Sequence, residues 1–184
     1  MCRKGTTQEY SPPVVADGAK PERQDCTGVP MKVRPVARHD APDWARMRTG
    51  LWPEAPADHG VEITDYFARP DESKAVFVSE EPDGALSGFL EAGMRPCAEG
   101  CLTSPVGYIE GWWVEPEHRG RGRGTALVKA AEDWARSCGL AEMASDAIQA
   151  NELSQSAHRA LGYAETARVV CFRKLLQSEG YADE

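Results

Sequence analysis

The stretch Tyr108–Gly124, with the sequence YIEGWWVEPEHRGRGRG, decides the fold of this chain. It begins as a short apolar and aromatic run, which predicts a strand, and it ends in a cluster of glycines and arginines. An amphipathic pattern typical of a helix begins at Thr125. Glycines let a phosphate approach the backbone, and the N–H groups at a helix N-terminus bind anions. The stretch therefore predicts a strand, a phosphate-binding loop and a helix, in that order.

Three kinds of phosphate-binding loop can be compared with this segment. A P-loop requires Gly-Lys-Ser/Thr, whereas Gly124 is followed directly by Thr125, so this type is excluded. A dinucleotide fingerprint would use Gly122 and Gly124 but lacks its third glycine, although Asp146 lies at a distance suited to a ribose contact. The third pattern is Arg119-x-x-Gly122-x-Gly124 directly after a strand. The motif by itself also leaves open a solvated, glycine-rich loop.

Composition indicates a folded globular protein. The chain has 184 residues, a length typical of one domain, with 41% hydrophobic residues and five tryptophans. Its net charge of −8 argues against nucleic acid as a partner and favours cationic ligands. No apolar run reaches the roughly 18 residues of a membrane span, and the N-terminus lacks the apolar core of a signal peptide. We therefore expect a cytoplasmic protein without membrane contact.

The six cysteines do not predict a metal site, because they are scattered, without a Cys-x-x-Cys pair or a histidine at ligand spacing. Cys97 and Cys101 suit a disulfide or half of a metal site, but unpaired loop thiols are the favoured interpretation. We expect no bound metal.

Residues 1–30 differ in composition from the rest of the chain. They contain four of the thirteen prolines, several charged residues and no apolar period, which is typical of a disordered extension. Met31 then begins an ordinary strand pattern, so we interpret residues 1–30 as an extension from an upstream start, without a catalytic part. The predicted folded domain spans residues 31–176, and a polar tail follows at 177–184.

The rest of the chain alternates strand and helix patterns. Asp40 can cap the first helix, which stops near Trp52, where a Pro-rich acidic loop over 52–60 follows. Strand-like runs lie at 31–36, 74–79, 86–93, 108–114, 142–146 and 166–176. Helical patterns lie at 40–52, 61–68, 125–138 and 151–161. Together they indicate an α+β fold with a central mixed sheet flanked by helices.

A second motif runs from Asn151 to Tyr163, as Asn151-x-x-Ser-x-x-Ala-His158-x-x-x-Gly-Tyr163. Together with the arginine and glycine loop at 119–124, it resembles the signature of the GCN5-related N-acetyltransferases (GNAT). His158 stands where that superfamily usually has a tyrosine, and Tyr163 replaces a phenylalanine. The resemblance implies the GNAT fold, in which two strands splay apart to admit acetyl-CoA.

Shorter segments narrow the resemblance to one subgroup, the aminoglycoside 6'-N-acetyltransferases. They are LW at 51–52, SPV at 104–106, EG at 110–111, EMASD at 142–146 and His-x-x-Leu-Gly at 158–162. The likeness spans about residues 31–175. It implies a homodimer, and the apolar run 169–172 is a candidate for strand pairing across a two-fold axis.

The resemblance also implies that acetyl-CoA is the cosubstrate. The implied acetyl-CoA-binding residues are Trp113, Val114, Arg119, Gly120, Arg121, Gly122, Arg123, Gly124, Thr125 and Asn151. Backbone N–H groups around Trp113 and Val114 would stabilise the oxyanion that develops on the acetyl carbonyl. Some of the arginines are expected to meet only solvent.

An aminoglycoside is a polycation, so its pocket needs carboxylates. Glu110 and Asp146 lie on neighbouring predicted strands and can face one cleft. Glu110 is the candidate general base, because the attacking amine must lose a proton; a glutamate in solvent or paired with an arginine is the alternative. Asp146 is a candidate for binding substrate ammonium groups and sharing the base role, or else for capping the helix near Asn151. Trp52 either lines the substrate pocket or closes the end of the first helix.

His158 is the candidate general acid, because the CoA thiolate leaves more easily when it is protonated. A histidine packed on a helix face is the alternative. No cysteine stands where a nucleophile is expected, so the resemblance implies direct transfer.

The resemblance thus implies acetyl transfer from acetyl-CoA to the 6'-amino group of aminoglycosides. Loss of that cationic group, which the antibiotics need for ribosome binding, would confer resistance. Another cationic amine, such as a polyamine or a protein amine, remains open as the acceptor. A non-catalytic acyl-CoA-binding sensor is the alternative from outside the enzymes.

Overall fold

The computed structural model describes residues 31–54 and 56–175, so the predicted extension over 1–30 and the tail over 177–184 lie outside the described residues. The strands are β1 (Lys32–Pro35), β2 (Lys74–Glu80), β3 (Leu86–Arg95), β4 (Val106–Val114) and β5 (Met143–Ser145). The helices are α1 (Ala41–Leu51), α2 (Pro56–Ala68), α3 (Arg123–Ser137) and α4 (Glu152–Ala160), with short 3-10 turns η1 (Arg38–Asp40) and η2 (Pro116–His118).

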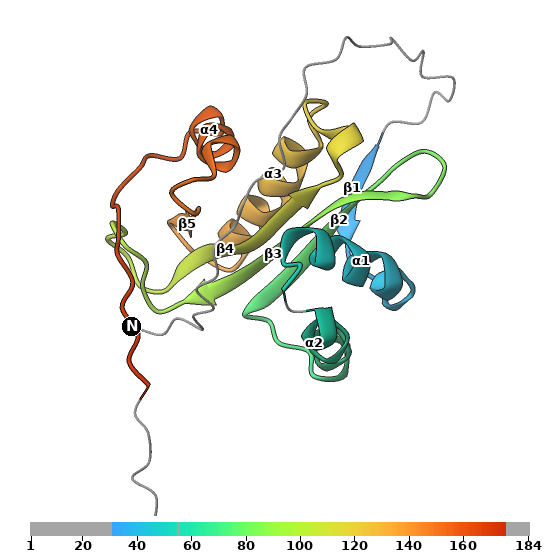
Figure 1. Ribbon diagram of the computed structural model, residues 1–184, viewed down its shortest axis with the longest axis horizontal. Coiled ribbons are helices and arrows are strands. Elements are labelled where there is room, and N and C mark those ends of the chain that lie inside the picture. The colour runs from blue at the N-terminus through green and yellow to red at the C-terminus, as the bar shows by residue number, and fades with distance from the viewer. Residues whose placement is uncertain (1–30, 55, 176–184) are drawn as a thin grey trace, which may run out of the picture.

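The described strands form one mixed sheet in the order β1-β2-β3-β4-β5. Strands β1 to β4 pair with one another in antiparallel fashion. Strand β5 is parallel to β4 and is reached through the crossover helix α3. Helix α3 packs along one face of the sheet, while α1 and α2 cover the other face (Figure 1). The predicted α+β fold with a mixed, helix-flanked sheet is confirmed.

Two apolar clusters fill the spaces between the sheet and its helices. Successive residues of β3 alternate between them, with Phe89 in the cluster under α1 and α2 and Leu90 in the cluster under α3. Both side chains are fully buried. On the first face Trp44 makes edge-to-face contacts with Tyr66 and Phe67, which fixes α2 against α1.

A β-bulge interrupts the ladder between β3 and β4 at Glu110. Glu91 pairs with Gly111 and Ala92 pairs with Ile109, so Glu110 is an extra residue on β4. A bulge directs two successive side chains to the same face. Gly111 faces Trp52 at the end of α1, and the Glu110 carboxylate lies beside Gly93 on that same face. The bulge therefore presents Glu110 on the α1 side of the sheet.

Three local predictions need correction. Helix α2 begins at Pro56, inside the predicted loop, because proline is compatible with a first helical turn and Ile63 anchors the helix in the core. The predicted strand over 166–176 is absent from the described part, where Val170 and Phe172 remain 78% and 93% exposed, since a strand needs a partner edge. Asp40 stands at the N-cap position just before α1, but its side chain accepts from the Ala37 N–H and pairs with Arg34 instead of capping α1.

Glu91 carries a charged group into the α1 face of the sheet. Its carboxylate accepts from Trp44 Nε1 at 2.8 Å and lies 3.5 Å from Arg48 Nη1, with the side chain 15% exposed. Burial outweighs these two contacts and raises the pKa of Glu91 to about 7. The folded protein therefore holds this proton more tightly than the unfolded chain does.

We predict that Glu91→Gln flattens the pH dependence of stability. In the wild type the contribution of this proton is complete below the ordinary pKa of 4.5 and is lost as the pH rises through about 7. Between pH 5 and pH 8 the unfolding free energy of the wild type should fall by about 2 kcal/mol more than that of the variant. Urea denaturation at several pH values measures this difference, and parallel profiles would contradict it.

Candidate active site

The open edge of β4 is the centre of the candidate site. Parallel pairing with β5 stops at Ile109 and Ser145, while β4 continues to Val114. The Glu115 N–H donates to the Ser87 carbonyl at 2.8 Å, so alternation along the strand turns the N–H and C=O of Val114 away from β3. Arg119 Nε donates to the Val114 carbonyl at 2.8 Å, as this direction requires. The Val114 N–H thus faces the gap beyond β5.

Alternation distinguishes the two predicted oxyanion donors. Trp113 pairs directly with Phe89 in the register that joins Glu115 to Ser87, so its N–H points into the β3–β4 ladder. Val114 alone of this pair directs its N–H to the open edge, where a developing negative charge can accept from it.

The loop after β4 has the form of an anion-binding cradle. Gly120 and Gly122 have φ angles of +67° and +82°, and a Cβ at either position would meet nothing within 4 Å. Gly122 is the N-cap of α3, and the first helical bond runs from the Ala126 N–H to the Gly122 carbonyl. By position, the N–H groups of residues 123–125, which include Thr125, have no helical acceptor. The fit to a pyrophosphate is therefore good.

The three arginines of the loop differ in what they contact. Arg123 makes a two-point ion pair with Glu81, at 3.0 and 2.7 Å, and hydrogen bonding to Arg123 lowers the pKa of Glu81 to about 2. This pair holds the start of α3 against the β2–β3 turn. Arg119 is exposed and stacks over the Trp113 ring at 4.8 Å, and Arg121 is exposed. Of the three side chains, those of Arg119 and Arg121 are exposed and could therefore contact a phosphate.

Four polar residues meet on the acceptor side. Glu110 Oε1 accepts from Arg95 Nε at 2.8 Å, and Arg95 Nη2 also bonds Glu110 Oε2. The Arg95 guanidinium lies over the Tyr108 ring, 3.4 Å from its centroid. Asp146 lies near enough to act electrostatically on Arg95. The two predicted carboxylates, Glu110 and Asp146, thus both act on the Arg95 guanidinium.

Sequence reasoning missed Arg95. It ends β3 two residues after Gly93, which pairs with Tyr108 of β4. The available signal was a basic residue two positions after Gly93, on the strand that pairs with the strand of Glu110. This signal can be used only when the register of the two strands is known.

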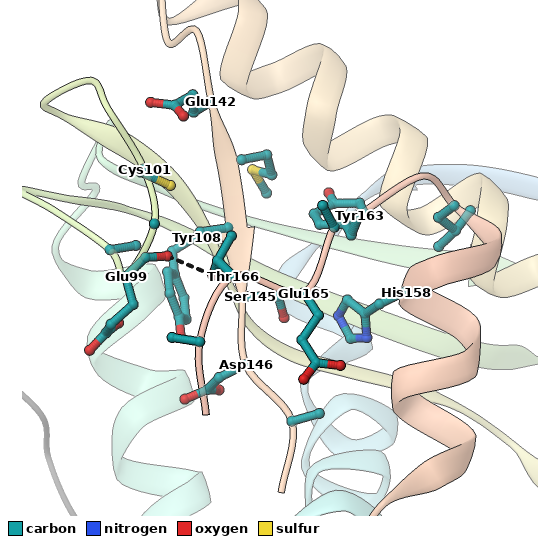
Figure 2. Close-up of a pocket in the computed structure, with 18 of the residues that line it drawn as sticks. Glu99, Cys101, Tyr108, Glu142, Ser145, Asp146, His158, Tyr163, Glu165 and Thr166 are labelled. Atoms are coloured by element: carbon teal, nitrogen blue, oxygen red, sulfur yellow. Dashed lines mark hydrogen bonds between the residues drawn. The ribbon is translucent and has the colours of Figure 1, made fainter. Parts of the chain in front are cut away.

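A cavity of about 560 Å³ opens beside β5. Tyr108 and Asp146 line it from the sheet, whereas His158 and Tyr163 line it from α4 and the segment that follows (Figure 2). It therefore connects the acceptor cluster with the aromatic side chains of α4.

Trp52 ends α1 and also packs beside the bulge. Its backbone N–H bonds the Arg48 carbonyl at 2.7 Å and ends α1, while its ring packs directly on Gly111 beside the bulge. The Arg48 guanidinium lies 5.1 Å from the ring centroid, and the ring stays partly exposed. Trp52 thus forms a wall next to Glu110.

His158 is packed between aromatic rings. Its Nδ1 lies 2.7 Å from the Ser154 carbonyl, which can only accept, so Nδ1 carries the proton. Its Nε2 is buried without a partner, and the ring contacts Trp112 and Tyr163 edge-on at 5.5 and 5.6 Å. This geometry favours the packing role over proton donation. Tyr163 itself donates to Glu132 at 3.2 Å.

The side chains of Asn151 and Glu142 have local structural roles. Asn151 caps α4 by accepting from the Ser154 N–H at 3.1 Å, so the helix cap is Asn151 and not Asp146. Glu142 accepts from the N–H groups of Leu102 and Thr103 at 2.8 and 2.6 Å and thereby fastens that loop beside β5. The hydrogen bond that the Thr103 hydroxyl donates at 2.6 Å, together with those from the two N–H groups, lowers the pKa of Glu142.

Within residues 31–54 and 56–175, no group of three metal-ligating side chains is gathered. No helix of the same residues has the length and apolar character needed to cross a membrane. Cys97 and Cys101 are free thiols.

The chain resembles known acetyltransferases in sequence and in structure. Residues 41–163 match the model of the acetyltransferase (GNAT) family. An aminoglycoside N(6')-acetyltransferase type 1 from Klebsiella aerogenes is 46% identical over 149 residues, covering 78% of this chain and 96% of the relative. A protein of the same name from Stenotrophomonas maltophilia is 42% identical, covering 79% and 94%.

Among solved structures, the aminoglycoside 6'-N-acetyltransferase AAC(6')-Ih from Acinetobacter baumannii has a TM-score of 0.74 at 34% identity, covering 80% of this chain and 100% of that one. AAC(6')-Iy in complex with the bisubstrate analogue CoA-S-monomethyl-acetylneamine matches with a TM-score of 0.74 at 35% identity and the same coverage.

We predict that Gly124→Ala destabilises the protein, because the added Cβ would lie 2.6 Å from Trp112 Cζ2 and force the indole to move. Overpacking of this kind costs about 1–3 kcal/mol, which exceeds the gain of about 1 kcal/mol from replacing glycine in a helix. The matched control is Gly60→Ala in α2, where a Cβ meets nothing within 4 Å and stabilisation is expected. Equal shifts of the two variants in urea denaturation would contradict the prediction.

Proposed function

The chain belongs to the GNAT family of acetyltransferases, and on that premise we propose that it acetylates the 6'-amino group of aminoglycoside antibiotics and so confers resistance. The observation that carries the proposal is the placement of Glu110 and Asp146 beside the point where β4 and β5 separate. The similarity of nearly the whole folded part to named aminoglycoside N(6')-acetyltransferases supports the acceptor.

The donor side of the proposed site is the loop between β4 and α3. Acetyl-CoA, the cosubstrate of GNAT enzymes, supplies the acetyl group as a thioester. The exposed side chains of Arg119 and Arg121 and the N–H groups at the start of α3 would hold its phosphates. Arg123 contributes through its backbone, because Glu81 engages its side chain. Asn151 contributes by fixing the start of α4.

The acceptor side is suited to a polycation. Glu110 and Asp146 supply two carboxylates, Tyr108 supplies an aromatic face and Trp52 a flat wall beside the bulge. The net charge of −8 raises the local concentration of such a substrate. A cytoplasmic location follows from the need for acetyl-CoA.

In the proposed reaction Glu110 accepts the proton that the 6'-ammonium must lose, directly or through one water. The neutral nitrogen then bonds the carbonyl carbon, the carbon–sulfur bond breaks and the sulfur leaves with the electron pair. The nitrogen loses its second excess proton to solvent and becomes the amide. The Val114 N–H is directed to the edge at which the oxyanion would develop. Asp146 binds a second ammonium group of the substrate. The packing of His158 leaves protonation of the departing thiolate to solvent.

We also propose a homodimer. The segment after α4 exposes large apolar side chains, including Val169, Val170 and Phe172 at 52%, 78% and 93%. It runs beside β5, the outermost strand of the described sheet, whose free edge can accept another strand (Figure 1). A second copy would cover both features.

We predict that the protein is dimeric by light scattering at micromolar concentration, and that Phe172→Glu shifts it toward the monomer. A charge at a buried interface position opposes association, because the carboxylate would lose its water. The control is Lys174→Glu in the same segment. A monomeric wild type would contradict the proposal.

We predict that the purified protein releases CoA thiol from acetyl-CoA when kanamycin is added, and that NMR locates the acetyl group on the 6'-nitrogen. Spermidine and a lysine peptide are assayed in parallel. Thiol release with one of these two but not with kanamycin would replace the aminoglycoside by another cationic amine. Binding of CoA without turnover of any amine would indicate a sensor.

The control for this assay is Glu110→Gln. Loss of the base should lower turnover by about 10²–10⁴-fold, the range of general acid–base catalysis, with CoA affinity nearly unchanged. Full turnover in this variant would exclude Glu110 as the base.

A further inference from the structure

Arg95 occupies the position on Glu110 that the substrate ammonium must take. Its Nε lies 2.8 Å from Glu110 Oε1, and Nη2 bonds Oε2, so the guanidinium engages both oxygens of the carboxylate. A two-point pair of this kind is the strongest geometry between these groups. The proposed base therefore already has a cationic partner in the protein without substrate.

Two other features converge on the same guanidinium. Its central carbon lies 3.4 Å from the centroid of the Tyr108 ring, within the range of a cation–π contact. Hydrogen bonding to Glu110, opposed by burial, raises the pKa of Arg95, and the charges of Glu110, Tyr108 and Asp146 add to this rise. Two carboxylates beside an aromatic face attract any cation and not only the guanidinium of an arginine.

The backbone shapes this place. Gly93 precedes Arg95 by two residues on β3, and a Cβ at Gly93 would lie 3.3 Å from Glu110 Oε1. The bulge directs Glu110 to the same face as Gly93. The strands thus position the carboxylate, while the cation sits on a long side chain at the very end of β3.

We propose that Arg95 is an internal counter-cation that fills the ammonium subsite of the empty enzyme and is displaced by the polycationic substrate. This inference rests on the proposed function and names a specificity-determining residue of that site. Arg95 is 30% exposed and Glu110 36%, so the guanidinium can swing into water without leaving a buried charge unpaired.

Because a ligand must displace Arg95 from Glu110, only a ligand with enough further contacts can bind. A ligand with one ammonium exchanges one cation for another at Glu110 and gains little. A polycation regains the loss through further contacts, for example with Asp146, whose charge also acts on Arg95. Arg95 therefore lowers the affinity for every cation and leaves only ligands with several charges bound at working concentrations.

The test is the binding of neamine and of spermidine to Arg95→Gln, measured by titration calorimetry in the presence of CoA. The dissociation constants of both polycations should fall by about three- to tenfold, because the competing cation is gone. Arg95→Lys keeps the charge but loses the two-point geometry and the planar stack, and it should lie between the wild type and Arg95→Gln.

The matched control is Arg69→Gln, which removes the same charge from an exposed pair with Asp65 just after α2. Its dissociation constants should stay within about twofold of the wild type, since the charge is exposed, pairs with Asp65 and not with Glu110, and is screened by salt. Thermal unfolding of each variant checks that it is folded, and if Arg95→Gln does not fold, Arg95→Lys decides by the same titration.

Unchanged or weaker polycation binding in the folded Arg95→Gln variant would overturn the proposal and make Arg95 a structural or substrate-supporting residue. Absence of polycation binding in both proteins would overturn it as well. Failure of the proposed function is recognised separately, by a wild type that releases no thiol with kanamycin. In that case the spermidine titration still decides the role of Arg95.

Discussion

The extra residue in β4 at Glu110 is the constraint on which the arrangement of the site depends. In a regular strand Glu110 and Trp112 would point to the same face of the sheet. Because of the bulge, Glu110 shares the α1 face with Gly111, while Trp112 turns toward α3. The carboxylate is thereby placed on the acceptor side, and the indole beside it supports the donor loop. The extra residue thus directs the side chain of the acceptor side and the side chain that supports the donor loop to opposite faces of the sheet.

Contacts between tryptophan and glycine hold β4 where strand pairing cannot. Beyond Ile109 no strand of the described residues pairs with β4 on its β5 side. Trp112 instead packs on Gly124 of α3, and Trp113 packs on Gly50 of α1, where an added Cβ would lie 2.6 and 2.8 Å from the rings. Both helices can approach the strand this closely only because the glycines have no side chain. The open edge is therefore clamped from both faces, which keeps the Val114 N–H in a fixed direction.

Local signals made part of this structure predictable. The glycine and arginine loop and the helix after it follow from short-range pattern, and the family resemblance together with its place in a predicted strand suggested Glu110. The prediction of a strand at 166–176 was wrong, because β propensity is read from one segment alone. A strand forms only when a second strand pairs with that segment. His158 was readable as either acid or packing residue, and the choice depends on a carbonyl one turn earlier and on two rings from other elements.

The arginines show most clearly where sequence reasoning stops. Position in the motif assigned Arg123 to a phosphate, yet its side chain pairs with Glu81 across 42 residues, and Arg95 meets Glu110 across 15 residues. Both partnerships are fixed by strand register and by where a turn happens to meet a helix. A net charge of −8 likewise says nothing about which carboxylates are already matched. The β3–β4 register directs Glu110 to the acceptor side, and the same register places the Arg95 guanidinium against its carboxylate. The availability of the base is therefore set by an ion pair within the sheet and not by the overall acidity of the protein.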